Sequence, residues 1–199
     1  MHKDHLSVRE IKEQDIEAIT NYWLGADSKY MEAMGVDITK LPAKEEWFSM
    51  LVQQLSQPYP EKKSYCIIWE INGEASGHSN INKIQFAEEA YMHLHLWKKD
   101  VRTKGLGTEF IKMTIPYYFN NYALNTLYCE PYALNTAPNK TLQKAGFEFV
   151  KKYNDSHAVT PKLDHPVLSG SLCTAQDFLE LFDSQLISRH LDLMARVLR

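Results

Sequence analysis

Cysteine is scarce in this chain, and its spacing carries no recognisable pattern. Three cysteines occur among 199 residues, at positions 66, 129 and 173, and no CxxC pair is present. This argues against a disulfide framework and a zinc site, and it is typical of a reducing cytosol. The chain also lacks an apolar segment of signal-peptide type and any run of about eighteen apolar residues. We therefore expect a soluble cytoplasmic protein with no metal and no membrane partner.

An excess of basic residues is absent as well. Lysine and arginine together number 22 against 25 aspartates and glutamates, giving a formal net charge of -3. Nucleic-acid binding needs clustered cations to neutralise phosphates, so we expect no nucleic-acid partner. The 44% hydrophobic and 24% charged residues are typical of a globular protein with one sizeable core.

Hydrophobic periodicity predicts alternating strands and helices. Asn72-Gly73 between two apolar runs is typical of a hairpin, and Pro116 should kink or end the helix that contains it. Strands are expected over 6–11, 65–71, 74–84, 91–97, 125–131 and 147–153, and helices over 14–25, 43–55, 106–124 and 135–145. This order predicts a mixed α/β fold.

The pattern changes after residue 154. Pro161, Pro166 and the run LSGSL are typical of a linker, and a long amphipathic helix is expected from Ala175 onward. We therefore predict one domain over 1–154 and an appendage over 155–199, made of a linker and a C-terminal helix.

A glycine-rich turn, Arg102-Thr-Lys-Gly105-Leu-Gly107, follows one predicted strand and opens a helix. Glycines let the backbone approach an anion, and the first-turn amides and the helix dipole attract it. The alternative is a plain tight turn. A dinucleotide fingerprint would need a third glycine and a downstream acid, and a P-loop would need Gly-Lys-Ser/Thr. The turn is therefore interpreted as a pyrophosphate cradle, with Arg102 and Lys104 as countercharges.

Two motifs together resemble the GNAT acetyltransferase superfamily. VRTKGLG resembles its Arg/Gln-x-x-Gly-x-Gly/Ala signature, and Asn135-Thr-Ala-Pro-Asn-Lys-Thr-Leu-Gln-Lys-Ala-Gly146-Phe147 resembles its second signature, closest to the RimJ/RimL type. The likeness covers about residues 6–153. It implies an α/β GNAT fold: a mixed, mostly antiparallel six- or seven-stranded sheet flanked by helices, here with a C-terminal helical appendage. It also implies acetyl transfer from acetyl-CoA to a primary amine.

The resemblance also implies which residues hold coenzyme A. The pantetheine arm should bind the strand that precedes the glycine-rich turn, where it splays from the next strand. The pyrophosphate should lie on the turn itself, and the motif asparagine should contact the cofactor or order the site. The residues concerned are Leu96, Trp97, Lys98, Arg102, Lys104, Gly105, Leu106, Gly107, Thr108 and Asn135.

Three residues are candidates for the base that removes the amine proton. Glu130 lies where some GNAT N-terminal acetyltransferases place a glutamate; the alternative is a strand-end acid that is solvated or paired with a lysine. His93 and His95 share one strand face, and imidazole suits proton transfer near neutral pH. Strand histidines are more often core residues. The polar residues 78, 80 and 82 could also face the cleft or solvent.

The chain departs from the family pattern at two positions. Many members have a proton-donating tyrosine where this chain has Leu142, so Tyr128, Tyr132 or water would have to protonate the thiolate. Pro138 stands where serine is common, which removes one side-chain contact. The aromatic residues 22, 23, 30, 47 and 48 lie where the family places its acceptor-binding helices, but their helical spacing is more typical of core.

The C-terminal segment, about 159–199, resembles the N-terminal leader of bacterial thiamine diphosphate-dependent 2-oxo acid dehydrogenases and stops before any cofactor site. Its apolar stripe is expected to pack on a partner, either the body of the same chain or a second copy of this chain in a homodimer joined through the C-terminal helix. The expected acceptor is a small-molecule amine or a peptide N-terminus. A catalytically silent module that binds CoA and regulates or docks onto another enzyme is the alternative function.

Overall fold

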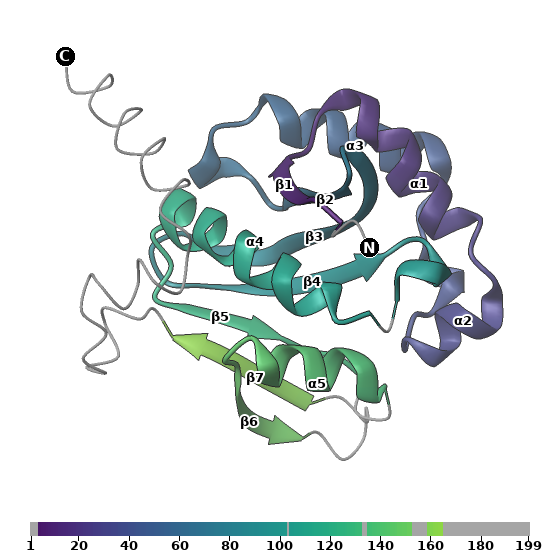
Figure 1. Cartoon of the computed structure of the whole chain (residues 1–199). Helices are drawn as coiled ribbons and strands as arrows, with labels where there is room; N and C mark the ends of the chain where they lie inside the picture. Colours follow the sequence, from purple (N-terminus) through teal and green to yellow (C-terminus); the bar gives the residue numbers. More distant parts are fainter. Residues whose placement is uncertain (1–3, 103, 133–134, 153–158, 165–199) are drawn as a thin grey trace. The chain divides into compact units, whose positions relative to one another are not determined.

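The computed structural model describes residues 4–102, 104–132, 135–152 and 159–164. Their strands and helices follow the mixed order that the sequence predicts (Figure 1). The elements are β1 (Leu6–Glu10), α1 (Ile16–Leu24), α2 (Ser28–Ala33), α3 (Lys44–Ser56), β2 (Tyr65–Ile71), β3 (Glu74–Gln85), β4 (Glu89–Leu96), α4 (Leu106–Tyr122), β5 (Thr126–Cys129), α5 (Thr136–Lys144), β6 (Glu148–Lys152) and β7 (Val159–Asp164), with short 3-10 turns η1 (Glu13–Asp15), η2 (Ile38–Lys40), η3 (Tyr59–Glu61) and η4 (Lys99–Val101).

The strands of these ranges form one seven-stranded sheet in the order β1-β2-β3-β4-β5-β7-β6. The pairs from β1 to β4 are antiparallel, β4 pairs with β5 in parallel, and β6 pairs with β7 antiparallel. The Asn72-Gly73 turn joins β2 to β3, with positive φ angles of 54° and 80° at its two residues. This confirms the predicted mixed, mostly antiparallel GNAT sheet with flanking helices.

Helices cover both faces of the sheet, because β2 is apolar on both sides (Figure 1). On one face, Cys66 and Ile68 of β2 pack with residues 16 and 19 of α1 and residue 51 of α3. On the other face, Trp69 stacks on Phe110 of α4, with ring centroids 5.0 Å apart, and its indole donates to Thr114 Oγ1 at 2.8 Å. We refer to the first face, toward α1 and α3, as the acceptor face.

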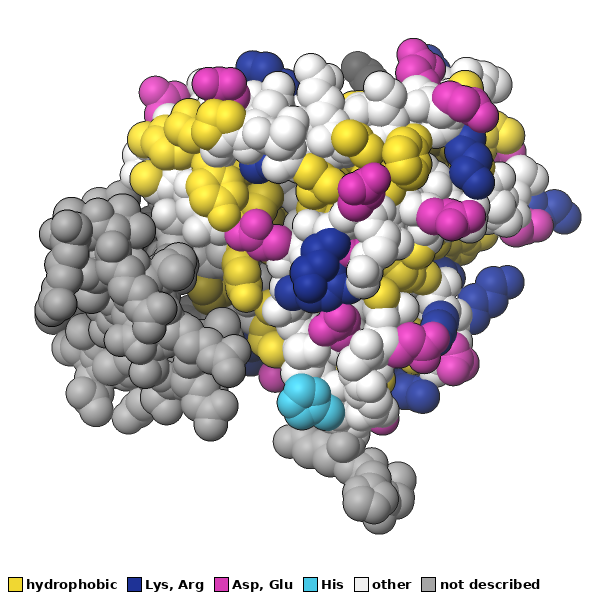
Figure 2. Space-filling model, turned by 90° about the horizontal axis from the view of Figure 1, so that it is seen from above, with side chains coloured by type: hydrophobic (Ala, Val, Ile, Leu, Met, Phe, Trp, Pro, Cys, Tyr) yellow, Lys and Arg dark blue, Asp and Glu magenta, His cyan; other side chains and the backbone are white. Residues whose placement is uncertain are grey.

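The surface over α1 and α3 carries charges of both signs. Figure 2, seen from above, shows hydrophobic patches interspersed with Lys, Arg, Asp and Glu side chains. Leu24 of α1 and Phe48 and Met50 of α3 are among the exposed large apolar residues.

The structure corrects two expectations drawn from proline. Of the two outcomes expected at Pro116, a kink or an early end, the early end is wrong, because Pro116 lies inside α4 and the helix continues to Tyr122. The buried side chains of Ile115, Tyr118 and Phe119 hold this part of the helix on the sheet despite the lost backbone hydrogen bond. Residues 159–164, expected within a linker, form β7, which lies in the sheet between β5 and β6.

The chain divides into two compact units, 1–163 and 164–199. The sheet therefore continues beyond the predicted domain boundary at residue 154. The C-terminal helix expected from Ala175, and with it a dimer through that helix, lies outside the described residues.

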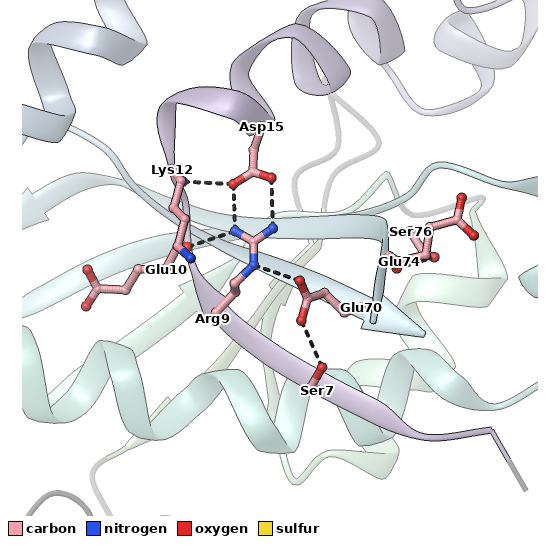
Figure 3. Close-up of polar contacts among 8 residues, drawn as sticks. All are labelled: Ser7, Arg9, Glu10, Lys12, Asp15, Glu70, Glu74 and Ser76. Atoms are coloured by element: carbon pink, nitrogen blue, oxygen red, sulfur yellow. Dashed lines mark hydrogen bonds and ion pairs between the residues drawn. The ribbon is translucent and has the colours of Figure 1, made fainter. Parts of the chain in front are cut away.

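An ion-pair cluster fixes the start of α1 to β1 and β2 (Figure 3). Arg9 of β1 forms a bidentate pair with Asp15, at 2.6 and 2.9 Å, and its Nε donates to Glu70 of β2 at 2.7 Å. Glu70 also accepts from Ser7 Oγ, and Asp15 accepts from the backbone N–H of Lys12. Burial alone would raise the pKa of Asp15, but the hydrogen bonds from Arg9 and Lys12 lower it below its ordinary value.

We expect Asp15→Asn to lower the free energy of unfolding by about 2 kcal/mol, measured by urea denaturation. Removing one partner of a buried pair typically costs about 3–5 kcal/mol, and the figure is smaller here because Arg9 is 23% exposed and keeps Glu70. The matched control is Glu74→Gln, which breaks the exposed pair with Lys98 and should cost less than about 1 kcal/mol. Equal losses in the two variants would contradict a special role for the Arg9 cluster.

Candidate active site

The parallel strands β4 and β5 separate halfway along β4. They pair from Glu89 opposite Thr126 to Met92 opposite Cys129, where β5 ends. β4 continues to Leu96, still paired with β3. The edge of β4 over 93–96 therefore has no strand partner among the described residues. We refer to the place where the pairing of β4 with β5 ends as the wedge; the expected splay of the two strands stays a prediction.

Glu130 and His93 flank the mouth of this wedge. They are the first residues after the last pair, Met92 and Cys129. The rings of Tyr91 and Tyr128 stack at 5.2 Å one pair earlier, so alternation places His93 and Glu130 on the same face of the sheet. Two of the three candidate bases are thus brought together at the wedge.

Each of these residues has a polar neighbour. Glu130 pairs with Lys83 of β3, with Nζ 3.3 Å from Oε2, and the glutamate side chain is 28% exposed. His93 Nε2 lies 3.2 Å from Asn82 Oδ1. Burial lowers the pKa of His93 and the charge of Lys83 lowers it further, whereas Glu130 raises it. His93 therefore favours its neutral form, which can accept a proton.

His95, the third candidate, lies in an aromatic cage under α1. Its Nδ1 lies 3.2 Å from the hydroxyl of Tyr22, and its ring packs edge-on against Trp23 and stacks on His78 at 4.8 Å. Burial holds the pKa of His95 well below its ordinary value, and His78, His93 and Arg102 lower it further. The shared strand face of His93 and His95 is therefore divided: the first lies at the wedge and the second is covered by α1.

His78 is the buried end of the same cage. It is 2% exposed, and its Nδ1 accepts a hydrogen bond of 2.8 Å from the indole of Trp97. The acceptor role fixes the tautomer with the proton on Nε2. Burial lowers the pKa of His78 to about 3. This neutral, stacked histidine has a structural role. Asn82, on the same strand, instead contacts His93 through its side-chain oxygen.

The glycine-rich turn has the geometry of an anion cradle. Gly105 is the N-cap of α4, at a φ of 78°, and no side chain caps the helix. A Cβ on Gly105 would meet no atom within 4 Å, so space is available above it. Gly107 differs, because a Cβ there would lie 3.2 Å from Thr141 of α5. The second glycine therefore allows α4 and α5 to pack closely.

Arg102 holds the end of β4 to the turn. Its Nε and Nη2 donate to the carbonyl of Leu96 at 3.0 and 2.8 Å, and Nη2 also donates to the carbonyl of Trp97. The guanidinium lies 4.3 Å from the ring centre of Tyr30 in α2. Arg102, expected as a countercharge, thus joins the predicted pantetheine-binding residues to α2. Lys104 is exposed in the turn, and Lys98 pairs with Glu74 at 2.6 Å.

The start of α5 contains a set of side-chain to backbone hydrogen bonds that the sequence did not indicate. Asn135 is the N-cap without a side-chain cap bond, and the amide of Asn139 donates to the carbonyls of Tyr132 and Asn135 at 3.1 and 2.7 Å. Leu142 is 0% exposed in the core. Tyr132 lies near Gly35 in the loop after α2, so it connects β5 to the acceptor face.

A cavity of about 510 Å³ lies between α1, the start of α2 and the end of β4. The aromatic residues at 22 and 30, interpreted from sequence as core, line it, whereas Trp23 and Trp47 do pack in the core. The helix α2 was not predicted, because six residues are too few to show a period; Asp27 caps it by accepting from the Tyr30 N–H. The lining includes Asn21, Tyr22, Asp27, Tyr30, Trp97, Lys99 and Arg102.

In the parts of the chain that the structure describes, no three His, Cys, Asp or Glu residues lie close enough to hold a metal ion. Within the same ranges, no helix combines the length and hydrophobicity needed to cross a bilayer.

We expect the buried histidines to make the fold sensitive to acid. The pKa of His78 falls from 6.5 to about 3 on folding, so between these values the unfolded chain binds the extra proton. Stability is therefore fully present above pH 6.5 and decreases as the pH falls, by about 1.4 kcal/mol per pH unit for this group. Urea denaturation at pH 7 and pH 5 measures the slope.

His78→Gln keeps an acceptor for Trp97 but cannot titrate, so the slope should flatten. The exposed His5→Gln variant is the control and should retain the wild-type slope. A His78→Gln slope equal to that of wild type would contradict the assignment.

The comparisons with known proteins agree with this geometry. A family profile described as an acetyltransferase (GNAT) domain matches residues 5–148. No curated protein matches the chain significantly in sequence.

Solved structures share the fold at low sequence identity. RimL, a ribosomal L7/L12 alpha-N-protein acetyltransferase in complex with coenzyme A, has a TM-score of 0.64 at 15% identity, over 80% of this chain and 93% of its own. AAC(6')-Ib, in complex with paromomycin and acetyl-CoA, has a TM-score of 0.65 at 19% identity, over 86% of this chain and 100% of its own. PseH, an N-acetyltransferase of Campylobacter jejuni, has a TM-score of 0.55 at 15% identity, over 80% and 98%.

The profile match spans most of the chain. The chain belongs to the GNAT acetyltransferase family.

Proposed function

We propose that this protein transfers an acetyl group from acetyl-CoA to a primary amine by direct attack in a ternary complex. The observation that carries the proposal is the wedge between β4 and β5, with Glu130 and His93 at its mouth on the acceptor face. Enzymes of this fold in complex with CoA or acetyl-CoA support the choice of donor.

The donor would bind along the end of β4 and over the N-terminus of α4. The edge of β4 over 93–96 has no strand partner among the described residues, so its backbone groups and those of the following Trp97 and Lys98 would face the pantetheine amides. The carbonyls of Leu96 and Trp97 already accept from Arg102, so a pantetheine amide would be a second donor to them. The amides of Lys104, Gly105, Leu106, Gly107 and Thr108 surround the uncapped helix start, where a pyrophosphate is stabilised by the helix dipole. Thr108 N–H already donates to the Gly105 carbonyl, so the preceding amides are the better donors. Asn135, at the start of α5, would contact the cofactor or order the loop.

Catalysis requires removal of a proton from the acceptor ammonium before the nitrogen attacks the thioester carbonyl. Glu130 is the proposed base, and His93 is the alternative through its neutral imidazole. His95 would act only by holding Tyr22 and the cage, because it is covered by α1 and disfavours a proton. The departing thiolate would take a proton from Tyr128, Tyr132 or water, because Leu142 cannot donate one.

The acceptor class is a primary amine. RimL is named for acetylating a protein N-terminus, and AAC(6')-Ib is named as an aminoglycoside acetyltransferase. The cavity beside Tyr22 and Tyr30, whose lining also includes Asp27 and Lys99, would hold the body of the acceptor. Its mixed charge favours neither a polycation nor a polyanion. An amine panel with acetyl-CoA, read as free thiol, tests the class.

The buried Leu142 favours one second function, a module that binds CoA without turnover. The same panel separates the two, because such a module would bind acetyl-CoA and release no thiol with any amine.

Gly105→Ala should weaken acetyl-CoA binding at least tenfold, about 1.4 kcal/mol, measured by calorimetry. The added Cβ would occupy the space above the turn and strain the left-handed backbone that orients the amides. Gly73→Ala is the matched control, since Gly73 has a φ of 80° and no atom within 4 Å of a Cβ, but it lies in the β2–β3 turn. Unchanged affinity in a folded Gly105→Ala protein would remove the cradle from the proposal.

Glu130→Gln should lower kcat about 10²-fold or more at neutral pH while acetyl-CoA affinity stays nearly constant. The amide keeps the shape of the side chain but cannot accept the amine proton. The remaining activity should rise toward high pH, where the amine arrives neutral. Steady-state kinetics over a pH series measures both effects.

The control for this variant is Glu74→Gln, which removes an exposed glutamate–lysine pair on β3 and should keep the wild-type kcat. His93→Asn and His95→Asn should act mainly on the KM of the acceptor. Near wild-type kcat in Glu130→Gln with a collapse in His93→Asn would assign the base to His93.

A further inference from the structure

Lys83 already occupies the place where an acceptor ammonium would lie. Its Nζ is 3.3 Å from Oε2 of Glu130, the proposed base, and 4.4 Å from the ring centre of Tyr91. Tyr91 belongs to the last pairs before the strands separate. The lysine therefore reaches from β3 across β4 to the end of β5, and its amine ends at the mouth of the wedge.

A β-bulge directs Lys83 onto this face. Asn82 pairs with Tyr91, and the register shifts between Asn82 and Gln85. In a regular strand Lys83 would point to the opposite face from Asn82. Here Lys83 has a left-handed backbone with a φ of 46°, uncommon for a residue other than glycine, and its ammonium lies above Tyr91. Bulges re-aim side chains in this way beside functional sites.

The contacts of Lys83 match those that an acceptor needs. A carboxylate within reach can remove the proton, and an aromatic face stabilises the ammonium before deprotonation. The lysine side chain is 62% exposed, so its ion pair with Glu130 is weak and its amine can exchange partners.

We propose that the enzyme acetylates its own Lys83. The inference rests on the proposed function, because it needs acetyl-CoA in the wedge. Glu130 takes a proton from the Lys83 ammonium, and the neutral nitrogen attacks the thioester carbonyl. The C–N bond forms, the C–S bond breaks, and coenzyme A leaves as a thiolate that takes a proton from water or a tyrosine. The product is Nε-acetyl-Lys83 and free coenzyme A.

The modification changes the mouth of the wedge. Acetylation removes the charge of Lys83, and with it both the ion pair to Glu130 and the cation–π contact to Tyr91. An external ammonium then no longer competes with the lysine for the carboxylate. Self-acetylation would thus prepare the site for its acceptor.

The test incubates the full-length protein with deuterated acetyl-CoA and no amine, and follows each lysine by peptide mass spectrometry after chymotryptic digestion. Lys40 is the internal control, since it also pairs with a carboxylate, Asp37 at 3.0 Å, but lies in η2 with an 81% exposed side chain. Lys83 should be labelled at least about tenfold faster than Lys40, and Glu130→Gln should slow Lys83 about 10²-fold while leaving Lys40 unchanged. The first-order rate should not change when the protein is diluted, because the reaction is intramolecular.

Four results would overturn the proposal. Labelling of Lys83 at the rate of Lys40 indicates ordinary chemical acetylation. A rate that falls on dilution indicates transfer between molecules. Turnover of an amine from the panel with Lys83 unlabelled refutes self-acetylation and leaves the proposed function standing. If no thiol is released, with either the panel amines or Lys83 as acceptor, both proposals are refuted.

Discussion

The separation of β4 from β5 is the constraint on which the rest of this structure depends. β4 can leave β5 only if its far end is held elsewhere, and β3 provides that hold. Gly77 lets the two strands approach so closely that a Cβ there would lie 2.5 Å from the His95 carbonyl oxygen, and the Trp97 N–H donates to the Ser76 carbonyl at 2.9 Å. Arg102 then ties the carbonyl of Leu96 to the glycine-rich turn. Backbone N–H and C=O groups without a strand partner can form hydrogen bonds with the amides of a ligand. The wedge is therefore suited to the amide-rich arm of a cofactor.

Burial divides the ionisable groups of the acceptor face into two sets. Under α1, desolvation favours the neutral forms of His78 and His95, whose rings stack, and His78 accepts a hydrogen bond from Trp97. At the wedge, Glu130 remains partly exposed and pairs with Lys83. His93 is intermediate between these two sets, because burial lowers its pKa whereas the charge of Glu130 raises it. The position of α1 therefore decides which of two residues on the same strand face can take part in chemistry.

The sequence predicted most of the fold, but not the hydrogen-bond and ion-pair partners of the proposed site residues. Alternation on β2 to β4 and the Asn-Gly turn predicted the sheet, and the glycine-rich turn predicted the start of α4. Two expectations from proline were wrong: Pro116 does not end a helix held by buried side chains, and Pro161 does not prevent residues 159–164 from joining the sheet. The alternation of side chains along a strand predicts that His93 and His95 lie on the same face, but it does not indicate which of them a helix will cover. The pairing of Lys83 with Glu130 depends on a bulge, for which no local pattern gives a signal.

The side of the proposed acceptor cavity that α1 forms is fixed at both ends of this helix. The Arg9–Asp15 pair joins the start of α1 to β1 and β2, and Tyr22 near its other end contacts His95. The start of α2 also lines the cavity, and this six-residue helix is capped by Asp27 and contacts Arg102 through Tyr30. Arg102 in turn donates to the carbonyls of Leu96 and Trp97, next to the turn that would bind the pyrophosphate. One residue therefore contacts both the proposed cofactor site and the proposed acceptor cavity.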